Sequence, residues 1–375
     1  MGFDPVVPSG TGPRGPGPDA EPFTREDPPV TDDMPMPGSL MAAELAEQPA
    51  VLGRLVARHA ADRDLVRAVL PGALAGTVLL ARGSSDNVAV YGRYLIEMAS
   101  GRPAGLAAPS VHTRYQADVD YAGYLAVALS QSGATPEVVE TAGRMRAAGA
   151  VVIAITNEEG SPLTQACDLT LLTEAGPELA VPATKTVTAQ MLAVAAIAAA
   201  CDPSLAAAAD LAVLPDAVSS LVSDSGPAGA LAARWADARR LVVTGRGLAY
   251  AAALETALKI KETARVHAEG LSSADLLHGP IAALDSRLPV LAVSGGARFA
   301  ADEAALTARL SAEGVPYAVC GAAAGAELPL PAGIGEVTAP ILAIIRGQQL
   351  ALASSLLRGL NPDAPTGLSK VTATH

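Results

Sequence analysis

Short apolar runs alternate with segments of helical periodicity along most of this chain. Helical patterns extend, for example, over 136–148 and 250–266. Strand-like apolar runs begin near residues 77, 124, 150 and 168, and again near residues 240, 287, 315 and 330. Strands and helices in this succession predict right-handed crossovers and a parallel sheet, and therefore an α/β protein.

The two series of strand-like runs have nearly the same spacing. Successive runs start 47, 26 and 18 residues apart in the first series and 47, 28 and 15 residues apart in the second. We therefore predict two tandem doubly wound, flavodoxin-like units over 39–215 and 225–375, with a linker in the polar, Gly- and Pro-containing stretch 223–229. Residues 40–59 are predicted to form an amphipathic helix that leads into the first unit.

The N-terminal segment differs from the rest of the chain. Residues 1–38 contain ten prolines and six glycines without an apolar face, which predicts a disordered tail. They also lack the basic and apolar regions of a signal peptide. The apolar stretch 191–201 is shorter than the roughly 20 residues that span a membrane, so we expect a buried core helix there and no membrane association.

Charge and composition restrict the class of function. The net charge is −12, so the basic surface that nucleic acid requires is missing. Cys167, Cys201 and Cys320 lie far apart, and the five histidines form no metal-binding motif. We therefore expect no disulfide framework, no protein-bound metal and no other cofactor, and the cysteine pattern favours a reducing cytoplasm.

The segment SQSGAT is the first candidate for ligand binding. Ser130, Ser132 and Thr135 surround Gly133 directly before a helix that is predicted to start at Pro136. Hydroxyl groups and free backbone N–H groups at a helix N-terminus bind anions such as phosphate. The same residues also suit an ordinary capped turn, so the pattern leaves both interpretations open. The equivalent segment of the second half, 294–297, has lost most of the hydroxyls, which predicts that only one half binds phosphate.

Charged residues in the second half form a second candidate. Glu255, Lys259 and Glu262 share one face of the helix predicted over 250–266. Their spacing alone favours a solvent-exposed stripe of ion pairs. Taken singly, His278 is expected to be a structural hydrogen-bond partner, and Lys370 a solvated surface charge.

Together these segments resemble the sugar isomerase (SIS) domain pair of glucosamine-6-phosphate synthase and its deaminase-like relatives. The resemblance extends over about 39–375, and the ending 361–374 and the segment ARGSSDN are more similar to the deaminase branch. The matching segments, in order, are MAAELAEQP (41–49), ARGSSDN (81–87), LSQSGAT (129–135), AGPELAVPATKT (175–186), TGRG (244–247), ALKIKETARVHAE (257–269), HGP (278–280) and GLSKVT (367–372).

The resemblance implies a role for particular residues. Glu262 matches the general base that moves a proton between C1 and C2 of the sugar, and Lys259 a residue that assists it near the sugar hydroxyls. His278 matches the histidine that opens the pyranose ring, typically from the neighbouring subunit of a homodimer. Lys370 matches a tail lysine that can form an imine with the open-chain ketose phosphate. The implied substrate-binding residues are Ser84, Ser85, Ser130, Gln131, Ser132, Thr135 and, through its backbone, Val181.

Departures from the family pattern leave the reaction open. No cysteine precedes Cys167, so the glutaminase nucleophile of the synthase is expected to be absent. Ala183 replaces a serine near the sugar, and Leu179 replaces a charged residue common in the deaminase branch. Further departures occur at Ala134, Asp275 and Leu277.

Three functions are compatible with this pattern. The first is deamination and isomerisation of glucosamine 6-phosphate to fructose 6-phosphate and ammonia. The second is a lyase that removes the C2 proton of N-acetylglucosamine 6-phosphate and expels the C3 hydroxyl, with Ala183 and Leu179 leaving room for the acetyl group. The third is a non-catalytic sugar-phosphate sensor. Because Glu262, His278 and Lys370 occur together and the tail has no helix-turn-helix pattern, an enzyme is favoured over a sensor.

Overall fold

The computed structural model describes residues 36–204 and 211–370. Apart from its last three residues, the predicted N-terminal tail therefore lies outside the described residues. Residues 36–38 lead directly into α1 (Ser39–Val69), which extends beyond the helix predicted over 40–59.

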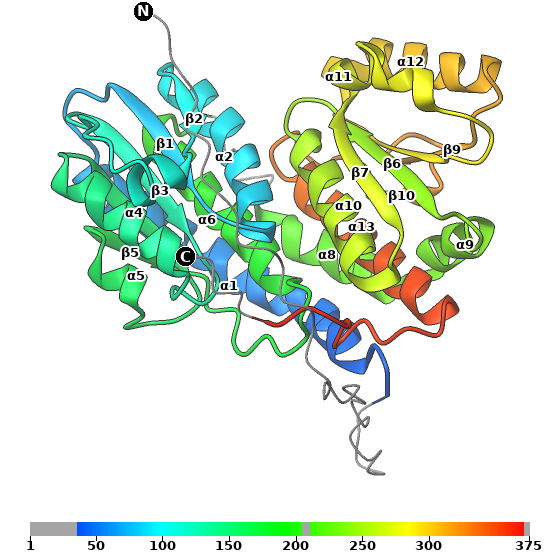
Figure 1. Ribbon diagram of the computed structural model, residues 1–375, viewed down its shortest axis with the longest axis horizontal. Helices are drawn as coiled ribbons and strands as arrows, with labels where there is room; N and C mark the ends of the chain where they lie inside the picture. The colour runs from blue at the N-terminus through cyan, green and yellow to red at the C-terminus, as the bar shows by residue number, and fades with distance from the viewer. Residues whose placement is uncertain (1–35, 205–210, 371–375) are drawn as a thin grey trace, which may run out of the picture. The chain divides into compact units, whose positions relative to one another are not determined.

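Two five-stranded parallel sheets form the frame of the described chain (Figure 1). Counted within its own half, each sheet has the strand order 2-1-3-4-5 of a flavodoxin-like unit. The first sheet is formed by β1 (Gly76–Leu80), β2 (Ala104–Leu106), β3 (Tyr124–Leu129), β4 (Val151–Thr156) and β5 (Leu169–Leu172). The second is formed by β6 (Arg240–Gly245), β7 (His267–Ser272), β8 (Val290–Val293), β9 (Tyr317–Gly321) and β10 (Leu328–Pro329). This confirms the predicted α/β class and the two doubly wound units.

The register of the strands brings their carboxyl ends to a common edge in each sheet. In the first sheet Leu80 of β1 pairs with Ala128 of β3, and Leu129 of β3 pairs with Ile155 of β4. The loops that follow β1, β3 and β4 therefore lie next to one another, where doubly wound proteins bind their ligands.

Helices connect the strands in both halves. The longer ones are α1, α2 (Ser84–Ser100), α4 (Pro136–Ala147), α6 (Lys185–Cys201), α8 (Leu214–Ser223), α9 (Gly226–Arg234), α10 (Ala249–Ala264), α12 (Ala300–Ala312) and α13 (Ala339–Leu357). The short ones are α3 (Pro109–Thr113), α5 (Pro162–Gln165), α11 (Ser273–Leu277) and the 3₁₀ turns η1 (Pro280–Ala283) and η2 (Ala297–Phe299).

One continuous apolar core joins the two halves. Its residues come from both sheets and from α1, α2, α6, α10 and α13. Small residues let the helices approach closely: a Cβ on Gly347 of α13 would lie 2.1 Å from the hydroxyl oxygen of Thr256 on α10. The low aromatic content of the chain thus suits a core of tightly packed Ala, Leu and Val.

Two helices in this core are strongly apolar. α6 is buried along almost its whole length, which confirms the core helix predicted over 191–201. α13 is long and apolar enough to cross a membrane, but 72% of its most apolar window is buried within the protein. This burial is typical of the core helix of a globular protein.

Three sequence predictions about strands were wrong. β2 and β7, both at sheet edges, were missed because β2 has three residues and β7 is partly exposed and carries polar side chains. The helix predicted to reach residue 266 ends at Ala264, where Arg265 adopts a φ of 53° and redirects the chain into β7. The strand predicted from residue 330 is instead the two-residue β10, which ends at Pro329.

Candidate active site

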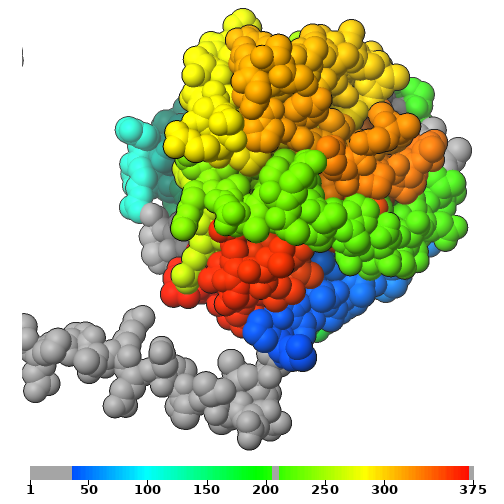
Figure 2. Space-filling view, turned by 90° about the vertical axis from the view of Figure 1, so that its right-hand side faces the viewer, coloured from blue at the N-terminus to red at the C-terminus, as the bar shows by residue number. Residues whose placement is uncertain are grey.

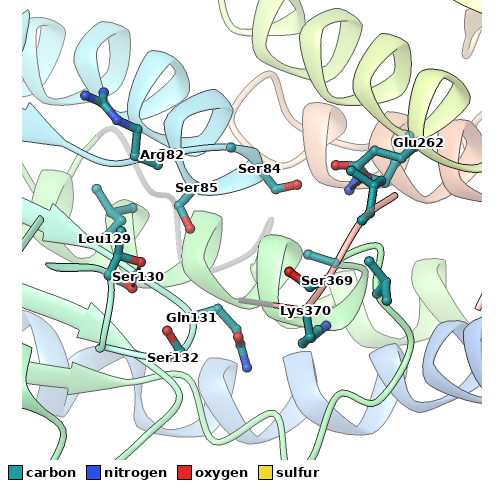
Figure 3. Close-up of a pocket in the computed structure, with 16 residues that line it drawn as sticks. Arg82, Ser84, Ser85, Leu129, Ser130, Gln131, Ser132, Glu262, Ser369 and Lys370 are labelled. Atoms are coloured by element: carbon teal, nitrogen blue, oxygen red, sulfur yellow. Dashed lines mark hydrogen bonds and ion pairs between the residues drawn. The ribbon is translucent and has the colours of Figure 1, made fainter. Parts of the chain in front are cut away.

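A cavity of about 380 Å³ opens at the carboxyl ends of β1 and β3, between the loop after β3, α10 and the C-terminal segment. In Figure 3 the side chains of residues 130–132 lie across this cavity from Glu262, Ser369 and Lys370. Every site residue proposed from the sequence except His278 lines it. These residues are Ser84, Ser85, Ser130, Gln131, Ser132, Thr135, Val181, Lys259, Glu262 and Lys370.

The loop after β3 presents unused hydrogen-bond donors to this cavity. Within the described residues, the backbone N–H groups of Gln131, Ser132 and Thr135 donate no hydrogen bond. Thr135 does not cap α4 with its side chain; its hydroxyl lies 3.2 Å from that of Ser130. The capped-turn interpretation therefore does not explain Thr135, and the free donors at the start of α4 are suited to an anion.

Gly133 gives this loop its shape. Its φ is +59°, and a Cβ at this position would lie 2.0 Å from the hydroxyl oxygen of Ser161. A side chain is excluded on both counts, so the sequence requires glycine where the backbone turns between Ser132 and Thr135.

Ser84 and Ser85 reach the cavity from the start of α2. Gly83 precedes them with a φ of +60°, and its free space leaves the helix N-terminus open to the cavity. Ser85 is buried, whereas Ser84 is partly exposed. A second helix N-terminus thus faces the cavity beside the loop after β3.

Two of the three charged residues of the predicted stripe on α10, Glu255 and Lys259, are buried, so the prediction of an exposed ion-pair stripe was wrong. Glu255 and Lys259 are 0% and 1% exposed, and Lys259 Nζ lies 3.5 Å from Glu255 Oε1. The same ammonium group donates a hydrogen bond to Glu262 Oε2. Asn87 donates to the other oxygen of Glu255, at 2.7 Å. Glu262, with a side chain that is 23% exposed, is the most accessible of the three, and it lines the cavity together with Lys259.

This arrangement sets the charges of the buried pair. Burial by itself would lower the pKa of Lys259, but the carboxylates of Glu255 and Glu262 outweigh it and raise that pKa. Burial also raises the pKa of Glu255, and the charge of Lys259 and the Asn87 hydrogen bond oppose this effect. Lys259 is therefore an ammonium group at neutral pH and holds Glu262 at the cavity wall.

Lys370 is not the solvated charge that its position near the C-terminus suggested. Its Nζ lies 2.8 Å from Glu178 Oε2 and 2.7 Å from the carbonyl oxygen of Ala180. Glu178 is buried and also accepts hydrogen bonds from the backbone N–H groups of Thr184 and Thr186. Burial would raise the pKa of Glu178, but Lys370 and these N–H donors outweigh it and lower that pKa.

Backbone contacts anchor the C-terminal segment beside the cavity. The Val181 N–H donates to the Asp363 carbonyl at 2.9 Å. The Asp363 carboxylate in turn accepts the N–H groups of Leu40 and Met41 in the first turn of α1. Residues 368–370 are thereby brought to the cavity wall.

Several residues singled out from the sequence lie elsewhere. His278 is exposed in the turn after α11 and does not line the cavity of its own chain. Leu179 is 66% exposed and lies outside the cavity, so its side chain does not affect the space for an acetyl group. Ala183, in contrast, lines the cavity. Ala134 and Asp275 are also exposed and outside the cavity.

Sequence reasoning missed Glu178 and Asn87. Both lie within segments that carry the family resemblance, GPELAVPATK and ARGSSDN. The signal that could have found Glu178 is a single acidic residue in the apolar segment PELAVPA, directly before Thr184 and Thr186. Their roles depend on contacts with residues far away in the chain, Lys370 and Glu255, which local patterns do not reveal.

The family model of the SIS domain matches residues 77–200 and 235–324 of this chain. The chain therefore belongs to the SIS domain family. Both sheets and the candidate active site lie largely within these matched residues.

Three relatives make the comparison more specific. Glutamine–fructose-6-phosphate aminotransferase (isomerizing) of Mycobacterium bovis is 31% identical over 369 residues, which cover 88% of this chain and 57% of that protein. A Silicibacter pomeroyi protein described as a phosphosugar isomerase is 32% identical, with a TM-score of 0.78 and coverage of 86% and 99%. The C-terminal domain of the Francisella tularensis glucosamine–fructose-6-phosphate aminotransferase is 25% identical, with a TM-score of 0.80 and coverage of 90% and 100%. The chain thus spans little more than half of the full-length aminotransferase.

Proposed function

We propose that this chain is a glucosamine-6-phosphate deaminase that isomerises its substrate, giving fructose 6-phosphate and ammonia. One observation carries the proposal: the Glu262 carboxylate, held by the buried Lys259, faces unused phosphate donors across a single cavity. Its volume of about 380 Å³ is within the range of small-molecule sites. Relatives that act on fructose 6-phosphate support the choice of sugar.

Binding begins with the phosphate group. The free N–H groups of Gln131, Ser132 and Thr135 and the hydroxyls of Ser130 and Ser132 bind its oxygens, beside Ser84 and Ser85 at the start of α2. These donors are fixed before the ligand arrives, so little ordering is needed on binding. The sugar then extends from this loop towards Glu262 and Lys370.

Glu262 moves the proton. In the open-chain aldehyde the Glu262 carboxylate removes the C2 proton while the aldehyde oxygen gains a proton, which gives an enolamine. The same group then returns the proton to C1 as the nitrogen gives up a proton to solvent, and the product is the C1 alcohol with an imine at C2. Addition of water at C2 releases ammonia and leaves the ketone of fructose 6-phosphate. Lys259 keeps the Glu262 carboxylate in position at the cavity wall, as a general base requires.

Lys370 and the partner subunit complete the proposed site. To form an imine with the ketose, Lys370 would leave Glu178, lose its proton and attack the C2 carbonyl, with loss of water. His278 is exposed on its own chain, which suits a ring-opening role at the cavity of a second subunit. A cytoplasmic homodimer is therefore part of the proposal.

A second candidate function is the lyase. Ala183 lines the cavity and leaves space that a larger side chain would fill, which favours an N-acetylated substrate. Glu262 would again remove the C2 proton, and the C3 hydroxyl would leave with a proton as water. The acetamido nitrogen would stay on the product.

An NMR time course with glucosamine 6-phosphate and N-acetylglucosamine 6-phosphate in parallel separates these functions. We expect fructose 6-phosphate and ammonia from the first compound and no change in the second. Loss of water from the N-acetylated compound would instead support the lyase, and saturable binding of both compounds without turnover would leave only a sensor.

The variant Glu262→Gln tests the base directly. We expect kcat to fall by a factor of about 100 to 10,000, as for other general bases, with unchanged circular dichroism. Glu313→Gln, at an exposed carboxylate after α12, serves as the matched control. Turnover near that of the wild type in Glu262→Gln would remove Glu262 from this role.

A further inference from the structure

A second cavity, of about 650 Å³, lies at the amino ends of three strands of the second sheet. It is lined by residues that precede or begin β6, β8 and β9, namely 234–240, 286–289 and 316–317. The strands are parallel, so their amino ends lie on one side of the sheet, and this cavity lies there. The two cavities have no lining residue in common.

This cavity is rich in arginine although the chain as a whole is acidic. Arg234, Arg239, Arg240 and Arg287 line it, and Asp237 is the one acidic residue among its described lining residues. The chain carries a net charge of −12, so this concentration of positive charge is local. A bound anion would relieve the mutual repulsion of the four guanidinium groups.

Part of this positive charge has no hydrogen-bonded partner in the described chain, although the charges of Arg240 and Arg287 both act on the carboxylate of Asp285. The side chains of Arg239 and Arg240 make no hydrogen bond or ion pair within residues 36–204 and 211–370. Arg287 pairs only with the nearby Asp285, at 3.4 Å, and its side chain is 84% exposed. Arg234 is the exception, because it contacts Glu327 at 3.2 Å and the Tyr317 carbonyl at 3.1 Å.

Two aromatic side chains line the same cavity. Trp235, the single tryptophan of the chain, is half-buried and packs against the main core. The guanidinium carbon of Arg234 lies 5.3 Å from its ring centroid. Tyr317 lines the cavity from β9. Indole and phenol rings can contact an aromatic ligand, here over the part of the Trp235 ring that Arg234 and the core leave exposed.

The backbone around the cavity is held in place. Arg358, just after α13, donates to the Ala238 carbonyl at 2.6 Å. The N–H groups of Val242 and Val290 donate to the carbonyls of Pro289 and Pro316, at 3.0 and 2.9 Å. The arginines and aromatic rings therefore project from a fixed frame. α9, whose last residue is Arg234, lies at the right-hand edge of Figure 1 and so faces the viewer in Figure 2.

We propose that this cavity binds a nucleotide, with a nucleoside diphosphate as its simplest form. Arg239, Arg240 and Arg287 bind the phosphate oxygens, because the guanidinium fork matches phosphate geometry. Trp235 and Tyr317 contact the base. The volume is within the range of small-molecule sites. The proposal uses no residue of the candidate active site and does not depend on the reaction proposed there.

Tryptophan fluorescence of the full chain tests the proposal. Trp235 is the only tryptophan, so a change in emission with excitation at 295 nm reports this cavity alone. We expect a saturable change with ADP, and affinities at least tenfold lower for inorganic pyrophosphate and for adenosine. The absence of a saturable change at millimolar ADP would overturn the proposal, as would equal affinity for pyrophosphate.

Variants show whether ADP binds through the arginines of this cavity or through any exposed arginine. Arg239→Ala/Arg240→Ala is expected to weaken ADP binding at least tenfold without changing the circular dichroism, because both side chains are exposed. Arg309→Ala, at an exposed arginine on α12, is the matched control and should bind as the wild type does. Glu262→Gln should also bind normally, which distinguishes this site from the candidate active site. Unchanged affinity in the double variant would contradict the proposal.

Discussion

The loops after β3 and β8 occupy the same place in two sheets of the same topology. They differ in whether their hydrogen-bond donors have an acceptor within the protein. After β3, the N–H groups of Gln131, Ser132 and Thr135 point to no acceptor within the described chain. After β8, the Gly295 N–H and the Ser294 hydroxyl donate to the Glu303 carboxylate, at 2.6 and 2.8 Å.

In the second half an internal carboxylate thus fills the place of an anion. Glu303 lies in the first turn of α12, where a negative charge is also favoured by the helix dipole. If the loop after β3 binds phosphate as we propose, each sheet offers an anion site after its third strand, and one side chain decides whether that site stays open. In our proposal the first half binds the phosphate, whereas the second supplies Glu262, Lys259 and His278 for the chemistry.

The largest expected effect tests whether His278 acts in the site of the neighbouring subunit. We expect His278→Ala and Glu262→Gln each to lose about 100-fold or more in kcat as homodimers, since each lacks an acid–base group. Subunits of the two variants, mixed under conditions that allow exchange, should regain up to about a quarter of wild-type activity, because a mixed dimer has one intact site. Activity that stays at the level of the single variants would show that His278 does not act across a dimer.

The next effect concerns the ion pair between Lys370 and Glu178, which ties the C-terminal segment to the loop before α6. Glu178→Gln leaves the Lys370 ammonium group without its anionic partner, and we expect a loss of about 3 kcal/mol in the free energy of unfolding at pH 7. Urea denaturation measures the change. Glu174→Gln, at an exposed carboxylate, is the control and should lose less than about 1 kcal/mol.

The same contact predicts a pH dependence. The pKa of Glu178 is lowered in the folded state, so its stabilising contribution is present above the ordinary value of 4.5 and is lost as pH falls through the lowered pKa. The wild type should therefore lose more stability than Glu178→Gln on acidification below pH 4.5. Parallel curves for the two proteins would mean that Glu178 does not stay ionised in the folded state.

A smaller effect compares the two loops directly. Ser132→Ala removes one donor to the phosphate, and we expect KM to rise about 5- to 10-fold with little change in kcat, because the lost interaction is made in both the ground state and the transition state. Ser294→Ala, the matching change after β8, should leave KM unchanged. A similar rise in both variants would show that the loops are not functionally distinct.

The smallest effect tests the role of Glu303. Glu303→Ala leaves the Gly295 N–H and the Ser294 hydroxyl without their acceptor, with an expected loss of about 1 to 2 kcal/mol of stability in buffer without multivalent anions. Sulfate should restore part of the lost melting temperature beyond its general effect on the wild type. An identical response of both proteins to sulfate would contradict the view that Glu303 occupies an anion site.

Much of the fold was predictable because its signals are local. Apolar runs in β1, β3, β4, β6, β8 and β9 identify buried strands, and their repeated spacing predicts the duplication. The edge strands β2 and β7 escaped prediction because they bury less and therefore need fewer apolar residues. In the site, the loop residues after β3 were identified from their hydroxyls and from the turn at Gly133, which are also local features.

Most of the strands and helices, the family resemblance and the segments that form the candidate site could be read from the amino-acid sequence. Which charges are buried became clear only from the packed structure. Glu255 and Lys259 have the spacing of a surface stripe, but α10 packs into the core and turns this face inward. Lys370 meets Glu178, 192 positions away, and Glu303 rather than a ligand meets the loop after β8. Burial and long-range pairing depend on how all elements pack at once, which no local pattern contains.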